Sequence, residues 1–252
     1  MRSFEAATYD RYAAERERPS RDLIARLTGP PPRRILDLGC GSGLSTLALA
    51  ETFADAEIVG VDISPNMLAA AARKLPRVRF AQGDAAHFDT AGFDLVFANA
   101  VMQWAPGHIN LMRRIAQALP YGGRLAVQSP DNLDEPSHRA MRDVAARLGV
   151  HVAPRETIGS FGDYEAALVP PCSELDLWRT TYAHRLNGPD DIVKWVEGTG
   201  LRPYLDGLDA HGRMTFLAMY GEAVAQAYPP SPSGIVLFPF PRLFLVATRG
   251  RG

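Results

Sequence analysis

The sequence lacks the features that define several large classes of protein. It has two cysteines in 252 residues, too few for a disulfide framework, so we expect a cytoplasmic protein. No apolar run is long enough to cross a membrane, and the early charges do not fit a secretion signal. The net charge of -1 gives no field that would attract nucleic acid. The six histidines are scattered, so we expect no metal site.

One short segment carries most of the functional information. Residues 35–43 place Asp37 and three glycines between an apolar run and a stretch, 44–53, that is typical of a helix. A strand, a tight loop and a helix in this order often bind nucleotide-like ligands. The spacing is G-x-G-x-G, which differs from the dinucleotide fingerprint, and no phosphate-binding lysine follows. Asp37 would attract an ammonium group, so the loop fits S-adenosylmethionine.

Polar residues also follow the next predicted strands. Asp62 ends a strand at 57–62, where its carboxylate could accept hydrogen bonds from a ribose diol. Asp84 could accept one from an adenine amino group, and Asn99 ends the fourth strand. Each alone could be a helix cap or a turn residue, but together they favour one ligand crevice. The candidate cofactor-binding residues are Asp37, Gly39, Cys40, Gly41, Asp62, Ile63, Asp84, Ala85, Asn99 and Trp104.

The sequence also predicts the surroundings of two of the less polar candidates and of one further tryptophan. We expect Cys40 to be a shielded loop residue and not a nucleophile, because no histidine or cation lies near it in the sequence. Trp104 is predicted to pack beside the cofactor. Trp195 lies on a predicted amphipathic helix and is expected to be a core residue.

Outside the glycine loop, the chain predicts alternating strands and helices, then a different pattern after Gln128. Residues 129–132 predict a turn, and residues 150–171 predict an ordered loop rich in proline and glycine. Pro239 and Pro241 suggest that the early part of the last strand is irregular or lies at an edge. Further strands are predicted at 78–80, 93–98, 123–128, 172–185 and 235–248, and helices at 65–75, 136–148, 190–198 and 211–228. We expect one domain over 1–252, with a helical lid at 1–28, a cofactor-binding core at 33–128, a helical cap at 130–171 and 188–234, and final strands at 172–187 and 235–249.

Several segments along the whole chain carry a family resemblance. They include Leu36-Asp-Leu-Gly-Cys-Gly, Phe97-Ala-Asn-Ala, Asp176-Leu-Trp-Arg-Thr-Thr-Tyr, Thr199-Gly-Leu-Arg-Pro-Tyr-Leu and Phe240-Pro-Arg-Leu-Phe. The chain resembles class I S-adenosylmethionine-dependent methyltransferases and, within them, the trans-aconitate 2-methyltransferase family. The resemblance implies an α/β fold of Rossmann-like type: a mostly parallel seven-stranded sheet with helices on both faces and a helical cap. It also implies methylation of a carboxylate of trans-aconitate, with S-adenosylhomocysteine as the second product.

The expected chemistry fits the residues. A carboxylate is already ionised at neutral pH, so it needs no catalytic base, and the protein has to orient the two reactants. A tricarboxylate pocket should contain arginines, whose forked donors match carboxylates. The alternative for each arginine is an ordinary salt bridge or, for Arg18, a solvated helix face. The candidate substrate-binding residues are Arg179, Tyr182, Arg202, Arg242, Arg18 and Tyr9.

Other functions remain open from the sequence. One is methylation of another small or carrier-linked carboxylic acid, and another is non-catalytic binding of S-adenosylmethionine. Methylation of nucleic-acid bases is disfavoured because Asn99 is followed by Ala-Val-Met and not by a Pro-Pro-aromatic run. The loop spacing and Asp37 disfavour a nicotinamide oxidoreductase. We expect a small-molecule tricarboxylate as the partner, with neither membrane nor nucleic acid, and a monomer or weak homo-oligomer.

Overall fold

The computed structural model describes residues 13–153 and 156–251, which form two compact units. Unit 1 comprises Met1–Pro130, Glu156–Thr180 and Leu243–Gly252, and unit 2 comprises Asp131–Arg155 and Thr181–Arg242. Two long strands, β6 (Cys172–Leu186) and β7 (Val236–Arg249), contribute residues to both units.

A seven-stranded sheet has the order β3-β2-β1-β4-β5-β7-β6. Its first five strands in the sequence are β1 (Arg34–Leu38), β2 (Glu57–Asp62), β3 (Arg79–Gln82), β4 (Leu95–Asn99) and β5 (Arg124–Pro130). They pair in parallel, so their carboxyl ends meet at one edge. The chain builds outward from β1 to β3 and then returns to add β4 on the other side of β1. Open α/β sheets bind ligands at a reversal of this kind. The predicted fold class is confirmed.

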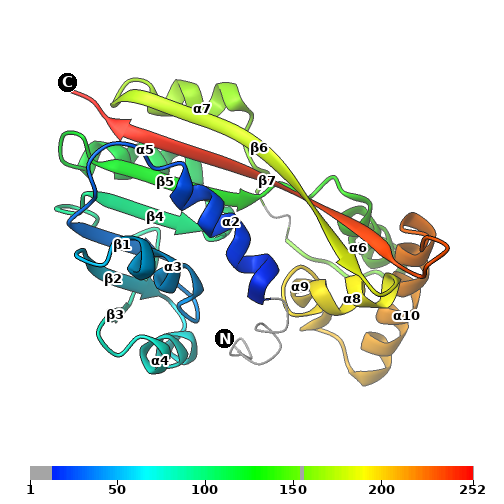
Figure 1. The fold of residues 1–252 in the computed structure, drawn as a ribbon. Coiled ribbons are helices and arrows are strands. Elements are labelled where there is room, and N and C mark those ends of the chain that lie inside the picture. Colours follow the sequence, from blue (N-terminus) through cyan, green and yellow to red (C-terminus); the bar gives the residue numbers. More distant parts are fainter. Residues whose placement is uncertain (1–12, 154–155, 252) are drawn as a thin grey trace. The chain divides into compact units, whose positions relative to one another are not determined.

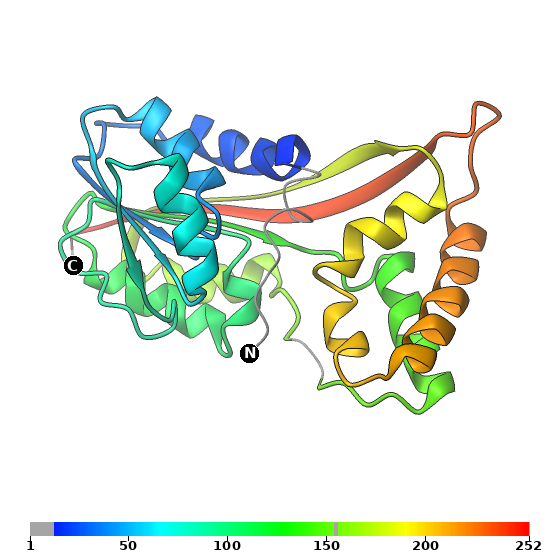
Figure 2. The same cartoon turned by 90° about the horizontal axis from the view of Figure 1, so that it is seen from below.

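Helices cover both faces of the sheet in unit 1. The helices α2 and α3 pack together on one face, and α5 and α7 pack together on the other (Figures 1 and 2). Their bounds, with that of α4, are α2 (Ala13–Ala25), α3 (Leu44–Thr52), α4 (Pro65–Lys74), α5 (His108–Ala118) and α7 (Phe161–Leu168). The core between sheet and helices includes Leu36, Val96, Met112, Tyr164 and Leu245, all fully buried. Burial on both faces explains why the strands appear as continuous apolar runs in the sequence.

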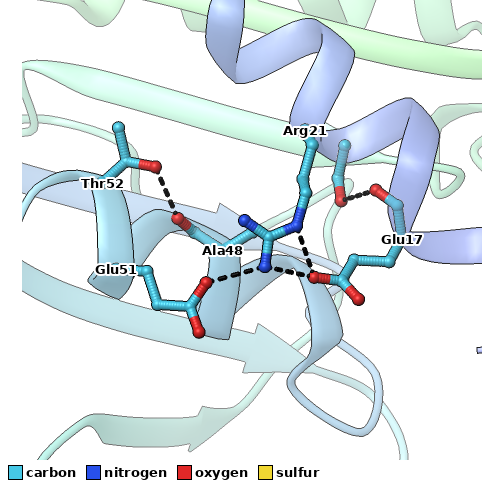
Figure 3. A network of polar contacts seen from close by, with 6 residues as sticks. Glu17, Arg21, Ala48, Glu51 and Thr52 are labelled. Carbon is cyan, nitrogen blue, oxygen red and sulfur yellow. Dashed lines mark hydrogen bonds and ion pairs between the residues drawn. The ribbon is translucent and has the colours of Figure 1, made fainter. Parts of the chain in front are cut away.

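An ion-pair network joins α2 to α3 (Figure 3). Arg21 on α2 donates from Nε to Glu17 one turn earlier, at 2.6 Å, and from Nη2 to Glu51 on α3, at 2.7 Å. The three side chains are partly exposed, so each pair adds at most about 1 kcal/mol. The network therefore orients α2 more than it stabilises the fold. Within the helix predicted over residues 1–28, residues 13–25 are helical and 26–28 are not, and residues 1–12 lie outside the described residues.

Unit 2 contains α6 (Pro136–Leu148), α8 (Pro189–Glu197), α9 (Arg202–Leu205) and α10 (Ala210–Ala227). Helix α10 packs against α6 and α8. Trp195 on α8 is buried, and its ring lies edge-on to Phe238 and tilted against Phe240 on β7. The prediction that Trp195 is a core residue is confirmed.

Two local predictions are wrong, and a third holds in one of its alternatives. The loop expected at 150–171 contains helix α7, which a capping box starts: Ser160 accepts from the amide of Asp163, whose carboxylate accepts from the amide of Ser160. The turn expected after Gln128 begins later, because β5 continues to Pro130. Strand β7 is regular through both prolines. Because the amide of Asp131, just after β5, donates to the carbonyl of Pro241, the part of β7 before Pro241 extends past the end of β5 and lies at an edge, which is one of the two arrangements predicted.

Among the helices that the structure describes, each is too short or too polar to cross a membrane. The described residues also contain no group of three or more histidine, cysteine, aspartate or glutamate side chains that could hold a metal ion.

Candidate active site

The glycine loop connects β1 to α3 and has an unusual backbone. Gly39, Gly41 and Gly43 have φ angles of 75°, 54° and 86°, a region that glycine enters without steric cost. The amides of Gly39 and Cys40 both donate to the carbonyl of Val61, at 2.7 and 2.9 Å, which anchors the loop to β2. A Cβ on Gly39 would lie 2.4 Å from the side chain of Val101. The loop after β1 is therefore pressed directly against the loop after β4.

Asp37 lies fully buried beneath this loop. Its Oδ2 accepts hydrogen bonds from Ser45, at 2.8 Å, and Thr46, at 2.6 Å, at the start of α3. Its Oδ1 is also buried and has no hydrogen-bond partner. Burial raises the pKa of Asp37 to about 6, against the opposing effect of the two hydroxyls, and the charge of Asp62 adds to the rise. A cationic ligand group would supply the missing partner and favour the ionised form.

Asp62 links the glycine loop to the start of α4. Its Oδ2 accepts from the amide of Gly41, at 2.9 Å, and its Oδ1 accepts from the amide of Ser64, at 2.8 Å. Ser64 in turn caps α4. Each carboxylate oxygen can accept a second hydrogen bond, so the predicted contact with a ribose diol remains chemically available. The adjacent Ile63 is exposed and offers an apolar surface at this position.

Asp84 forms a turn after β3. Its Oδ1 accepts from the amide of Ala86, at 2.9 Å, and its Oδ2 lies 3.4 Å from Nδ1 of His87. Ala85 is half-buried between them. The proposed contact of Asp84 with an adenine amino group stays a prediction.

Cys40 is almost fully buried, and burial raises the pKa of its thiol, with a further contribution from the charge of Asp37. The prediction that Cys40 is shielded is confirmed, and the raised pKa disfavours the thiolate form that acts as a nucleophile. Trp104 is 49% exposed, which excludes a core position and is compatible with packing against a ligand.

The loop after β4 contains a strained residue. Ala100 has a φ of 55° and is the one non-glycine residue with a positive φ in the described part of the chain. Its amide donates to the carbonyl of Gln128 on β5, at 2.8 Å, and its carbonyl accepts from Nε2 of Gln103, at 2.7 Å. Strain of this kind persists only where neighbouring contacts hold it.

Buried polar atoms without a hydrogen-bond partner gather where β1, β4 and β5 end. A polar atom left in this state costs about 1–3 kcal/mol, so a group of them at one sheet edge indicates a ligand that supplies the partners. Sequence reasoning identified Asp37 and Asn99 but missed Gln103, Ser42 and Ser129. Ser42 and Gln103 lie a few residues after β1 and β4, and Ser129 lies near the end of β5. The atoms are Asp37 Oδ1, Ser42 Oγ, Asn99 Oδ1, Gln103 Oε1 and Ser129 Oγ.

The three predicted substrate arginines have different surroundings. Arg179, in unit 1, stacks on Phe161, 4.6 Å from the ring centre. Arg242, in unit 2, is buried and lies 4.8 Å from the ring centre of Phe240. Arg202, also in unit 2, has its Nε 3.8 Å from the carboxylate of Asp206 one turn later. A buried guanidinium beside an aromatic ring is the arrangement expected of an anion site, so Arg242 is the strongest candidate.

The remaining candidates are Tyr182, Arg18 and Tyr9. Tyr182 is buried in unit 2 with its ring stacked on His184. Arg18 is exposed and lies 4.0 Å from the carboxylate of Asp22 one turn along α2. Tyr9 lies outside the described residues. The convergence of these side chains and the arginines on one substrate stays a prediction.

Comparisons with known proteins agree with this geometry. A family described as "Methyltransferase domain" matches residues 35–123. A solved structure of phosphoethanolamine N-methyltransferase 2 from Haemonchus contortus, in complex with phosphomonomethylethanolamine and S-adenosylhomocysteine, has a similar fold. Its TM-score is 0.56 at 18% identity, covering 93% of this chain and 53% of that one. The fold and the matched domain define a methyltransferase.

Two curated relatives give the family more closely. The chain is 52% identical to the trans-aconitate 2-methyltransferase of Methylobacterium nodulans over 100% of both chains. It is 44% identical to the enzyme of the same name from Rhodopseudomonas palustris strain HaA2, over 99% of this chain and 100% of the relative. The chain therefore belongs to the trans-aconitate 2-methyltransferase family.

Proposed function

We propose that this protein transfers a methyl group from S-adenosylmethionine to a carboxylate of trans-aconitate. The products are the monomethyl ester and S-adenosylhomocysteine. The observation that carries the proposal is the group of buried, unpartnered polar atoms at the carboxyl ends of β1, β4 and β5. The substrate is proposed from the full-length similarity to relatives that bear this name.

The donor set at the sheet edge fits the cofactor. Asp37 Oδ1 and Asn99 Oδ1 are acceptors for an ammonium group, and Asp62 retains acceptor capacity for a ribose diol. The glycine loop has no side chain except those of Cys40 and Ser42, so a ligand can approach its backbone closely. When bound, S-adenosylmethionine supplies an electrophilic methyl group on a sulfonium.

The protein's own tasks in this reaction are binding, orientation and exclusion of water. A carboxylate acceptor is ionised at neutral pH, so no side chain has to remove a proton from it. Burial also raises the pKa of the Cys40 thiol, which disfavours its use as a nucleophile. Holding the two reactants together in line can by itself supply a large rate acceleration.

Substrate specificity is proposed to depend on arginine side chains. Arg179 and Arg242, each stacked on a phenylalanine, and Arg202 would bind the carboxylates that are not methylated. Tyr182, Arg18 and Tyr9 are proposed as further substrate-binding residues. Bidentate arginine–carboxylate contacts distinguish a tricarboxylate from acids with fewer charges.

The experiment is an S-adenosylhomocysteine-release assay with trans-aconitate, cis-aconitate, citrate and isocitrate. We expect turnover that is selective for trans-aconitate. Cofactor binding without turnover on any of the four acids would disprove the substrate assignment and favour another acid or a non-catalytic role. Failure to bind S-adenosylmethionine in a calorimetric titration would disprove the cofactor assignment as well.

A further inference from the structure

The side-chain amide of Gln103 is fixed in one orientation. Its Nε2 lies 2.7 Å from the carbonyl oxygen of Ala100. Because a carbonyl can only accept a hydrogen bond, the NH2 group must face Ala100 and Oε1 must point away from it. Gln103 is only 5% exposed, and Oε1 is buried without a hydrogen-bond partner. The residue therefore presents a fixed acceptor that no described protein group uses.

The position of this acceptor is defined by contacts of its loop. Val101, two residues earlier, occupies the space that a Cβ of Gly39 would need. Ala100 is bonded to the end of β5 through its amide and to Gln103 through its carbonyl. The loop of Gln103 thus packs against the glycine loop through Val101 and against β5 through Ala100.

A fixed hydrogen-bond acceptor determines which charge the contacting group of a ligand can carry. It repels a carboxylate oxygen and attracts a hydrogen atom that carries positive charge, including the polarised C–H groups beside a sulfonium. The proposed function brings one sulfonium and one ammonium to this site. Asp37 Oδ1 and Asn99 Oδ1 are further buried acceptors at the same edge and suffice for the ammonium.

We propose that Oε1 of Gln103 contacts the sulfonium end of S-adenosylmethionine and makes the protein prefer the charged methyl donor to its neutral product. The proposal rests on the proposed function for the identity of the donor. During transfer, a lone pair of a substrate carboxylate oxygen forms a C–O bond to the methyl carbon. The S–C bond breaks, its electron pair stays on sulfur, and no proton moves. Sulfur loses its positive charge, so the contact with Oε1 weakens and product release is favoured.

The test compares S-adenosylmethionine with S-adenosylhomocysteine, which differ at this end by one methyl group and one charge. Dissociation constants for both are measured by calorimetry on the wild-type protein and on Gln103→Met, which keeps the length of the side chain but removes the acceptor. We expect S-adenosylmethionine to bind about tenfold more weakly to the variant and S-adenosylhomocysteine to change by less than about twofold. Equal weakening of both ligands would overturn the proposal, because an ammonium contact or a structural role would have this effect.

Two further variants keep the test decisive. Gln103→Met also removes the hydrogen bond that holds the strained backbone of Ala100. The substitution is therefore also made in the Ala100→Gly variant, where glycine adopts the positive φ without strain. The ratio of the two dissociation constants should shift in this double variant relative to Ala100→Gly alone, and an unchanged ratio would overturn the proposal. Gln117→Met, on the exposed face of α5, is the matched control and should leave both constants unchanged.

These measurements are made without substrate, so they are independent of the acid that is methylated. A shifted ratio with no turnover of trans-aconitate would disprove the substrate assignment and support the role of Gln103. Turnover of trans-aconitate with an unshifted ratio would support the substrate assignment and overturn the role of Gln103. A wild-type protein that binds neither ligand would overturn both proposals.

Discussion

The ring of His108 at the start of α5 shares a 3.0 Å hydrogen bond with the hydroxyl of Tyr164 on α7. The hydroxyl of Tyr164 also accepts from the amide of Gly159, at 3.3 Å. Nδ1 of His108 lies 3.5 Å from the carboxylate of Glu156. Glu156 also accepts from the amide of Gly107, at 2.8 Å. His108 and Tyr164 are buried, so the hydrogen bond between them joins in the interior the two helices that cover one face of the sheet.

Tyr164→Phe should destabilise unit 1. The substitution leaves Nε2 of buried His108 and the amide of Gly159 without a partner, which costs about 1–3 kcal/mol for a buried group. The measurement is the free energy of unfolding from urea denaturation. Tyr121→Phe is the control, because Tyr121 is 61% exposed and its hydroxyl is free to bond water. Equal stability of the two variants would contradict the network.

Asp37 should make stability depend on pH. Its pKa in the folded protein is about 6, whereas the ordinary value is 3.8, so the folded state holds the proton more tightly than the unfolded state. The resulting stabilisation is fully present below about pH 4 and is lost as pH rises through about 6, by up to about 3 kcal/mol. Asp37→Asn removes this loss. The check is urea denaturation of both proteins between pH 4 and 7, after subtraction of the slope common to both. A parallel pH dependence of the two proteins would show that Asp37 has an ordinary pKa.

The same ionisation should couple to cofactor binding. An ammonium group near Oδ1 favours the charged carboxylate, so binding of S-adenosylmethionine near pH 5.5 should release a proton from Asp37. Calorimetric titrations in two buffers of different ionisation enthalpy measure this release. Asp37→Asn should bind more weakly near pH 7 and release no such proton. Identical proton release by the two proteins would place the ammonium elsewhere.

Gly39→Ala should be more damaging than the same substitution at Gly122. Both glycines have nearly equal φ angles, 75° and 76°, so both variants pay the backbone cost of about 1 kcal/mol. A Cβ at Gly122 meets nothing within 4 Å, whereas at Gly39 it lies 2.4 Å from Val101. We expect an additional loss of about 1–3 kcal/mol for Gly39→Ala, as is usual for overpacking. Thermal unfolding of the two variants measures the difference, and equal losses would mean that the loops are not in close contact.

Sequence patterns predicted the centre of the sheet well because β1, β4 and β5 are buried on both faces. The strand at Glu57–Asp62 and the helix at Pro136–Leu148 match the prediction in both bounds. A loop was predicted in place of α7 because Gly159 and Gly162 suggest one. The signal that starts the helix, the Ser160–Asp163 capping box, was not taken into account. The hydrophobic pattern alone does not contain this information, since it depends on two side chains bonding to the backbone.

The sequence predicted candidate site residues only where the chemistry of the side chain is enough to suggest a role. Asp37 and Asp62 were identified because acids at strand ends have a known chemistry. Gln103 was not assigned a role, because its importance depends on the left-handed conformation of Ala100, and no pattern predicts a positive φ at an alanine. The two-unit division was also not expected, since β6 and β7 each contribute to both units.

Arg242→Ala should weaken the binding of the substrate without affecting the cofactor. Arg242 is buried against Phe240, and a guanidinium in such a place is stabilised by an anion that it binds through two parallel hydrogen bonds. We expect KM for trans-aconitate to rise at least about tenfold and the dissociation constant of S-adenosylmethionine to stay the same. Arg242→Lys keeps the positive charge and most of the packing but loses the fork, so it should fold normally and recover only part of the affinity. Arg185→Ala, at an exposed position of β6, should leave both constants unchanged. A full recovery by lysine would show that charge alone is needed, and an unchanged KM in Arg242→Ala would assign Arg242 to the core of unit 2 and leave the substrate's carboxylates to Arg179 and Arg202.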